Sequence, residues 1–164
     1  WSSDVCSSDL EVLGDVESVS GLTQQLKEQS GTDDVLFSTL KTAKGAIGTF
    51  TYGSAFGATD KSTFFKIFGT NGSATYDWSP SLPKPQITYA TGATSGQASS
   101  KTTIEIDEVN TIEEEFKNFK DAVANKDKKL VKVPPRKAFH HLAIVAAALE
   151  SSKNNGSNVK VETP

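Results

Sequence analysis

The sequence predicts an α+β domain in which helices pack on one face of an open, largely antiparallel β-sheet. From residue 16 to about residue 100, short runs of β-branched and aromatic residues are separated by Gly, Pro, Asn and Asp, as in a meandering sheet. After about residue 110 the apolar residues recur with the period of a helix. Because strands come first and helices afterwards, without βαβ alternation, we expect a sheet built of successive hairpins.

The first strands are expected at Val16–Leu22, Val35–Lys41 and Ala46–Tyr52. The last two are joined by Ala43–Gly45, a connection far too short for a parallel crossover, so they are predicted to form an antiparallel hairpin.

The clearest hairpin signal is Thr63–Gly69 followed by Ser73–Trp78. Asn71 and Gly72 lie between these runs and are expected to supply the positive φ angles of a tight turn. The sequence therefore predicts turn chemistry at Gly69–Ser73 and no phosphate-binding loop, because no helix begins there.

Further along, three prolines in the seven residues Ser79–Pro85 predict an extended connector. Additional strands are expected at Ile87–Tyr89, Lys101–Asp107 and, at an edge, Val159–Val161. The Gly, Ser, Thr and Ala residues of Thr91–Ser100 predict a mobile surface loop.

The first helix is expected to begin with a capping box made by Thr111 and Glu114. Its apolar residues fall on one face at spacings of four, three and four: Ile112, Phe116, Phe119 and Val123.

A second helix is expected after Pro134 and Pro135, ending near Asn155–Gly156. Its predicted apolar stripe consists of Ala138, Leu142, Val145 and Leu149.

The chain begins at Trp1 and contains no Met, which predicts a fragment of a longer protein. Residues 1–10 match one translated frame of a common sequencing-library adapter, so we expect them to be non-native and residues 11–164 to be one domain. Without them the chain has no Cys, which excludes disulfides and thiolate chemistry. The remaining charge is nearly balanced, with scattered signs, and does not suggest nucleic-acid binding. The longest apolar stretch, Leu142–Leu149, is too short to cross a membrane.

Candidate chemical groups have simpler structural explanations. His140 and His141 are neighbours about 100° apart on a helix, so they cannot chelate one metal together, and a solvated or interface-facing pair is expected. Glu113–Glu115 is expected to complement the helix dipole. The basic run is expected to be a solvated loop; it consists of Lys126, Lys128, Lys129 and Lys132. The two N-G-S sequons begin at Asn71 and Asn155, which are expected to be a turn residue and a helix-cap residue.

Several segments, taken in order, resemble the C-terminal domain of the Gfo/Idh/MocA oxidoreductases, which has a glyceraldehyde-3-phosphate dehydrogenase-like fold. The resemblance covers almost all of residues 11–164. It is carried by Gly14–Val16, Lys44–Phe50, Phe68–Ala74, Glu115–Phe119 and Ala143–Ser152.

The resemblance implies a cytoplasmic oxidoreductase whose N-terminal Rossmann domain binds NAD or NADP and which acts on a sugar, polyol or related carbonyl compound. The family's catalytic lysine and its later Asp/His motif lie N-terminal to this segment, and Glu11–Gly14 resembles the tail of the helix that follows that histidine. The chain is therefore expected to be a partial C-terminal domain, inactive by itself, with no catalytic, cofactor-binding or metal-binding residue of its own.

The resemblance also implies that this domain supplies a wall of the substrate pocket and an open sheet face for a homo-oligomer. Its expected partners are its own Rossmann domain, a second copy and a small-molecule substrate, with neither nucleic acid nor membrane. Two alternatives remain: a β-rich binding or surface module, suggested by the Ser, Thr and Gly content and the sequons, and a non-catalytic relative that serves as a scaffold. The two helices count against the first alternative.

Overall fold

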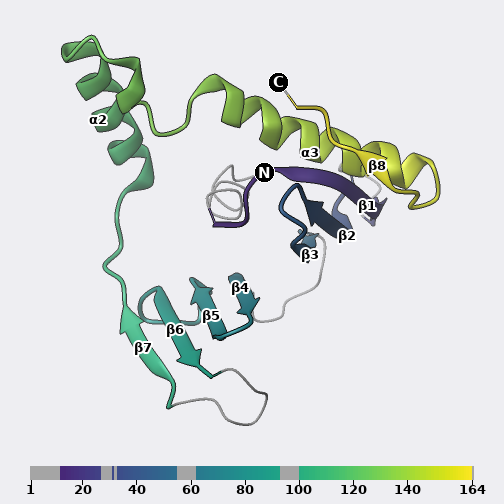
Figure 1. Ribbon diagram of the computed structural model, residues 1–164, viewed down its shortest axis with the longest axis horizontal. Helices are drawn as coiled ribbons and strands as arrows, with labels where there is room; N and C mark the ends of the chain where they lie inside the picture. The colour runs from purple at the N-terminus through teal and green to yellow at the C-terminus, as the bar shows by residue number, and fades with distance from the viewer. Residues whose placement is uncertain (1–11, 27–30, 32, 55–61, 93–99, 164) are drawn as a thin grey trace. The chain divides into compact units, whose positions relative to one another are not determined.

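The computed structural model describes residues 12–26, 31, 33–54, 62–92 and 100–163. The chain divides into two compact units (Figure 1). The first comprises Trp1–Gly57 with Val131–Pro164, and the second comprises Ala58–Leu130.

The first unit contains a four-stranded sheet of order β3-β2-β1-β8 in which every neighbouring pair is antiparallel. Its strands are β1 (Val16–Gln24), β2 (Val35–Thr42), β3 (Ile47–Gly53) and β8 (Val159–Lys160). The predicted hairpin of β2 and β3 is confirmed, and its turn is held by the Ala46 amide, which donates to the Thr42 hydroxyl at 3.0 Å. The predicted edge strand near the C-terminus is also confirmed.

Helix α3 (Pro135–Lys153) packs against β1 and completes the core of the first unit (Figure 1). The predicted start at the proline pair is confirmed, because Pro134 is the N-cap residue. The core residues come from the first two strands, the helix and the segment after β8: Val16, Val19, Leu36, Ile144, Ala147, Ala148 and Val161.

The stripe predicted for α3 is wrong. Leu142 is 70% exposed and Leu149 38% exposed, whereas the buried residues of the helix are His140, Ile144, Ala147, Ala148 and Ser151. The small side chains of Ala147, Ala148 and Ser151 let the helix approach β1 closely enough to hydrogen-bond its backbone. Large side chains would prevent that approach.

The predicted end of α3 near Asn155 and Gly156 is confirmed, and the structure shows that it is a Schellman motif. The Gly156 amide donates to the Ser151 carbonyl at 2.8 Å, and the Asn155 amide donates to the Ser152 carbonyl at 3.2 Å. Asn155 and Gly156 have φ angles of 55° and 80°, the left-handed conformation that the motif requires.

The second unit contains another four-stranded antiparallel sheet, of order β4-β5-β6-β7. Its strands are β4 (Phe64–Gly69), β5 (Gly72–Asp77), β6 (Gln86–Thr91) and β7 (Thr102–Glu105). The α+β class and its antiparallel pairing are thus confirmed, with the strands divided between two sheets. Most of the predicted loop Thr91–Ser100 lies outside the described residues.

The hairpin of β4 and β5 forms as predicted, with a different turn geometry. Gly69 pairs directly with Gly72, so Thr70 and Asn71 make the turn. Gly72 has a φ of 151°, but Asn71 does not have a positive φ, so that part of the prediction is wrong. The glycine alone provides the unusual backbone conformation at this turn.

The second unit also holds helix α2 (Thr111–Ala124) and the short 3₁₀ helix η1 (Lys128–Leu130). The predicted helix is confirmed, but the predicted capping box is wrong. Asn110 is the N-cap residue, and its side-chain oxygen accepts from the Glu113 amide at 3.2 Å. Thr111 is already the first residue of the helix. The predicted apolar face is 60% to 70% exposed; it consists of Ile112, Phe116, Phe119 and Val123.

Candidate functional site

The junction that leads into β1 is held by two other elements of the first unit. Gly14 has a φ of 79°. A Cβ on this glycine would lie 3.5 Å from Cε and 3.6 Å from Cδ of Lys44, so the lysine side chain packs against this point of the backbone. The Asp15 carbonyl accepts from the Ala43 amide at 2.9 Å. The Val16 amide donates to Nε2 of His140 at 3.0 Å. The turn between β2 and β3 and helix α3 therefore fix this junction together.

His140 is buried in the core, with only 3% of its surface exposed, which contradicts the expectation of a solvated or interface-facing pair. Because Nε2 accepts the hydrogen bond, the ring is neutral and its proton is on Nδ1. This Nδ1 atom has no hydrogen-bond partner within the described part of the chain. The side chain of His140 therefore serves in the core as the hydrogen-bond acceptor for a backbone amide.

His141 is half-buried and titrates differently from an exposed histidine. Burial lowers its pKa, and the positive charge of the neighbouring Lys137 lowers it further. Among the described residues, no group of three His, Cys, Asp or Glu side chains could hold a metal ion.

The other end of β1 is also bonded to α3 through side chains. The Gly21 amide donates to the Ser151 hydroxyl at 2.8 Å, and that hydroxyl donates to the Ser157 carbonyl at 2.6 Å. The Thr23 amide donates to the Ser152 hydroxyl at 2.9 Å. Together with His140, these serines accept from three backbone amides of one strand.

His140, Ser151 and Ser152 are structural hydrogen-bond acceptors that were not predicted from the sequence. A signal was present, because His140, Ile144, Ala147 and Ser151 follow the same spacings of four, three and four that identified the face of α2. Two of the four are polar, so a search for apolar residues passes over this face.

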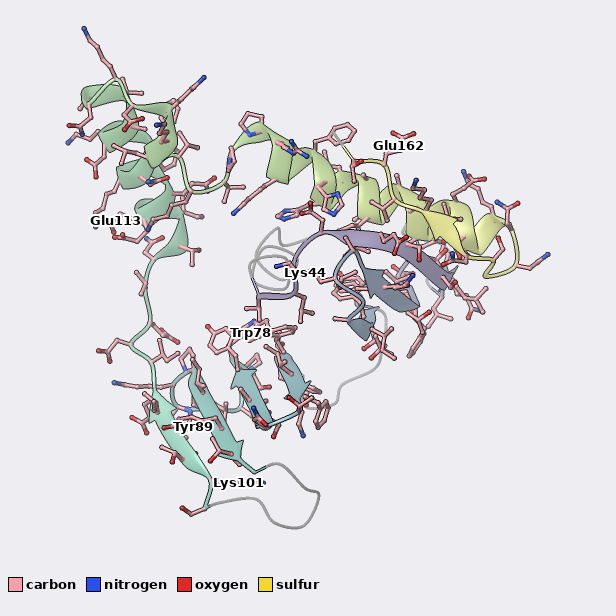
Figure 2. The ribbon with its side chains drawn as sticks, viewed as in Figure 1. Lys44, Trp78, Tyr89, Lys101, Glu113 and Glu162 are labelled. Atoms are coloured by element: carbon pink, nitrogen blue, oxygen red, sulfur yellow. The ribbon has the colours of Figure 1, made fainter. Side chains whose placement is uncertain are left out.

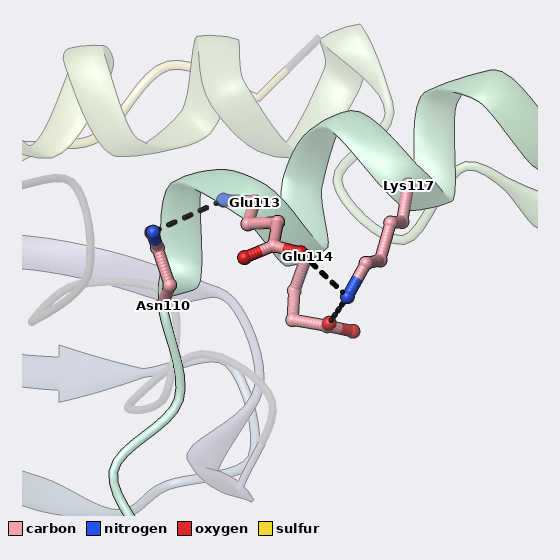
Figure 3. A network of polar contacts seen from close by, with 4 residues as sticks. All are labelled: Asn110, Glu113, Glu114 and Lys117. Atoms are coloured by element: carbon pink, nitrogen blue, oxygen red, sulfur yellow. Dashed lines mark hydrogen bonds and ion pairs between the residues drawn. The ribbon is translucent and has the colours of Figure 1, made fainter.

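The acidic residues at the start of α2 form a small network at the helix N-terminus (Figure 3). Lys117 Nζ lies 3.0 Å from a carboxylate oxygen of Glu113 and 2.8 Å from one of Glu114. The pKa of Lys117 is raised, mainly by its hydrogen bond with Glu114 and secondly by its hydrogen bond with Glu113. The carboxylates lie in the first turn, where they complement the helix dipole as predicted.

The remaining candidates have the structural roles that the sequence predicts, except that Lys128 and Lys129 lie in the 3₁₀ helix η1 and not in a loop. The basic residues Lys126, Lys128, Lys129 and Lys132 are all exposed. Asn71 lies in the hairpin turn, and Asn155 lies in the motif that ends α3. No helix among the described residues is long and apolar enough to cross a bilayer.

The sheet of the second unit has two chemically different faces, because cross-strand partners point to the same side. One row joins Phe65, Tyr76, Ile87 and Ile104, and the next joins Ile67, Ala74, Tyr89 and Thr102. The ring of Trp78 stacks on that of Tyr76 with centroids 4.8 Å apart. Figure 2 labels Trp78 and Tyr89 on this sheet. This side is apolar, and we call it the aromatic face.

The opposite side of the same sheet is polar in its central row, whereas Phe64 and Phe68 on the edge strand β4 are 58% and 77% exposed there. Its central row joins Lys66, Thr75, Thr88 and Thr103. The hydroxyls of Thr88 and Thr103 lie 3.0 Å apart and share a hydrogen bond.

Comparison with known proteins identifies the family. The sequence profile described as "Oxidoreductase family, C-terminal alpha/beta domain", that of the Gfo/Idh/MocA proteins, matches residues 10–161. The chain belongs to the Gfo/Idh/MocA oxidoreductase family. A family relative in Saccharomyces cerevisiae, described as uncharacterized, is 45% identical over 157 residues, which are 94% of this chain and 45% of the yeast protein.

Solved structures of oxidoreductases have the same fold as this domain. Levoglucosan dehydrogenase in complex with NADH matches with a TM-score of 0.79 and 16% identity, over 98% of this chain and 48% of the enzyme. Aldose-aldose oxidoreductase from Caulobacter crescentus, complexed with glycerol, matches with a TM-score of 0.75 and 12% identity, over 95% of this chain and 44% of the enzyme. The chain thus spans about half the length of the relatives it matches.

Proposed function

We propose that this chain is the C-terminal domain of an NAD(P)-dependent oxidoreductase that acts on a sugar, a polyol or a related carbonyl compound. The family match over residues 10–161 is the observation that carries the proposal. The names of structural relatives support the substrate class, since one acts on levoglucosan and another on aldoses.

In this proposal the nicotinamide cofactor is bound by an N-terminal Rossmann domain that precedes residue 11. The described residues themselves do not fit a dinucleotide site. Their glycine-rich segment Gly69–Ser73 forms a hairpin turn between two strands, and a pyrophosphate site of this kind needs a glycine-rich loop that opens a helix. The domain contributes a wall of the substrate pocket, and the catalytic lysine and histidine belong to the preceding half.

The aromatic face is our candidate for the surface through which two copies associate. Ile104 is 51% exposed and Tyr89 39% exposed on this face. Exposed apolar side chains of this size on a sheet favour burial against another surface. The resemblance implies a homo-oligomer formed through a sheet face, and this face has the chemistry that such contact requires.

The activity is tested with the full-length protein that carries this domain. We expect it to bind NADH or NADPH and to interconvert an aldose or polyol with its oxidised partner, followed by the change in nicotinamide absorbance. Residues 11–164 alone are expected to show no turnover. Cofactor binding without turnover on a broad carbonyl panel would instead favour the scaffold alternative, and an upstream sequence without a βαβ dinucleotide fold would contradict the proposal.

The association surface is tested by Ile104→Glu, which places a charge on the aromatic face. We expect this variant of the full-length protein to shift from oligomer to monomer in size-exclusion chromatography with light scattering. Thr103→Glu is the matched control, because this neighbouring residue points to the polar side of the sheet. Equal behaviour of the two variants would rule out the aromatic face as the interface.

A further inference from the structure

The segment Gly14–Ser18 is bonded to the rest of the first unit at nearly every residue. Beyond the Asp15 and Val16 bonds already described, the Glu17 carbonyl accepts from the Val161 amide at 2.9 Å. Its carboxylate pairs with Lys41 at 3.1 Å. The register between β1 and β2 shifts between Val16 and Ser18, so Glu17 forms a bulge. The chain therefore passes into the sheet along a path set by other elements.

We propose that His140 is a positioning residue for the active site, acting through its hydrogen bond to the Val16 amide. The proposal rests on the proposed function, in which the catalytic motif of the full-length enzyme precedes β1. Val12 and Leu13 have helical backbone conformation, so only Gly14 and Asp15 separate that helical segment from Val16. A shift at Val16 is therefore transmitted to the helical segment through a very short connection.

The chemistry of the bond explains why a histidine serves here. Val16 is 4% exposed, so water cannot replace the acceptor if Nε2 is lost. His140 is on α3 and 124 residues away in sequence, and its imidazole reaches the start of the strand from the core. The buried amide needs an acceptor at this place, and the imidazole provides one without burying a charge.

The position of the bond separates it from the other contacts between α3 and β1. His140 bonds the first residue of β1, whereas Ser151 bonds Gly21 in the second half of the strand. Both acceptors are buried, and both bonds connect the same two elements. Loss of either weakens the packing of α3, but only loss of the first frees the junction through which, in the proposed function, β1 is connected to the preceding catalytic motif.

The test compares three variants of the full-length enzyme: His140→Leu removes the acceptor, His140→Gln replaces it with an amide oxygen, and Ser151→Ala is the matched control. At a temperature where each is folded, we expect H140L to lower kcat by roughly 10- to 100-fold with a smaller change in KM, because small misplacements of catalytic groups have such effects. H140Q is expected to restore most of kcat, and S151A to leave it nearly unchanged. If H140L does not fold, His140→Asn takes its place, because its side chain is too short to reach the amide.

Amide hydrogen exchange gives a readout that does not need activity. In H140L the peptide containing Val16 should exchange about tenfold faster than in the unmodified protein, whereas in S151A it should not. Equal kcat for H140L and S151A, or unchanged exchange at Val16, would overturn the positioning role. If the unmodified enzyme turns over no substrate, the proposed function fails by itself, and the exchange experiment still decides whether His140 holds the junction.

Discussion

Gly72, in the hairpin of the second unit, lies directly against the backbone of the neighbouring strand β6. Its φ of 151° is rare for residues with a side chain, and a Cβ placed there would overlap the Ala90 carbonyl oxygen and lie 3.0 Å from Thr91 Cα. Both contacts are with backbone, which cannot move aside as a flexible side chain would. The absence of a side chain at this one residue therefore sets the spacing of the two strands.

We expect Gly72→Ala to lower the free energy of unfolding by about 1–3 kcal/mol, because the backbone would be strained and the strands forced apart. Gly69→Ala is the matched control in the same hairpin, since a Cβ there makes only an ordinary contact of 3.7 Å with the Gly72 carbonyl. Urea denaturation of the full-length protein measures both. Similar urea midpoints for the two variants would show that the backbone of β6 shifts to make room for the added Cβ.

His141 should make stability depend on pH. Its pKa is lowered in the fold by burial and by Lys137, so the unfolded chain binds the proton more readily than the folded one. The stabilising contribution of the neutral ring is complete above the ordinary histidine pKa, near 6.5, and is lost as the pH falls through it.

The measurement is the denaturation midpoint between pH 8 and pH 5, about the range in which histidine titrates. The unmodified protein should lose more stability on acidification than His141→Gln, which cannot take up a proton. Parallel pH profiles for the two proteins would show that another group dominates.

At the scale of elements, the start of α2 shows how neighbouring residues compete for one role. Both Asn110 and Thr111 are residues that cap helices, and a Glu follows each at a suitable distance. In the structure the Asn110 side chain accepts from Glu113, and Thr111 is inside the helix. The sequence therefore predicts the helix, but two adjacent capping residues leave its first residue undecided.

We expect Asn110→Ala to lower the free energy of unfolding of the helix by about 1 kcal/mol, the usual value of an N-cap. Thr111→Ala should change it by much less. Circular dichroism of a peptide spanning α2, or hydrogen exchange of the Glu113 amide in the full-length protein, measures the difference. A larger effect of the threonine variant would restore the capping box as the better description.

The helices and hairpins could be predicted well from the sequence, but the buried face of helix α3 could not. Alternation and turn residues are local signals, and they located both hairpins and both helices. The buried side of α3 depends on which residues let β1 come close, and Ala147, Ala148 and Ser151 give no signal of strong hydrophobicity. Leu142 gives that signal and is exposed.

At the scale of the whole molecule, pairings between distant segments escaped local reasoning. β8 joins β1 through Ser18 with Lys160 and Val19 with Val159, so the end of the chain completes a sheet that its beginning started. The short run Val159–Val161 predicts a strand but cannot indicate its partner. The candidate residues form structural contacts, and such contacts give no information about a substrate. The proposed function therefore had to come from the resemblance to a family.

Residues 11–164, expressed alone, are expected to be unstable as a monomer. The apolar face of α2 and the aromatic face of the second unit expose large side chains to water, which favours self-association over a single folded monomer. Calorimetry and light scattering of the purified segment measure this, with the full-length protein as the reference. A sharp cooperative melt of monomeric 11–164 would contradict the prediction.

The bonds between α3 and β1 also bear on aggregation. β8 pairs with β1 at only Ser18 and Val19, which leaves the amides of Gly21 and Thr23 beyond it, and the serines of α3 accept from both. These two amides are therefore not available to pair with a strand from a misfolded copy. Templated growth of this sheet is thereby directed to its other edge, β3, where Ile47 is 83% exposed. Within this four-stranded sheet, β3 therefore offers more unpaired backbone groups to another strand than the edge formed by β1 and β8 does.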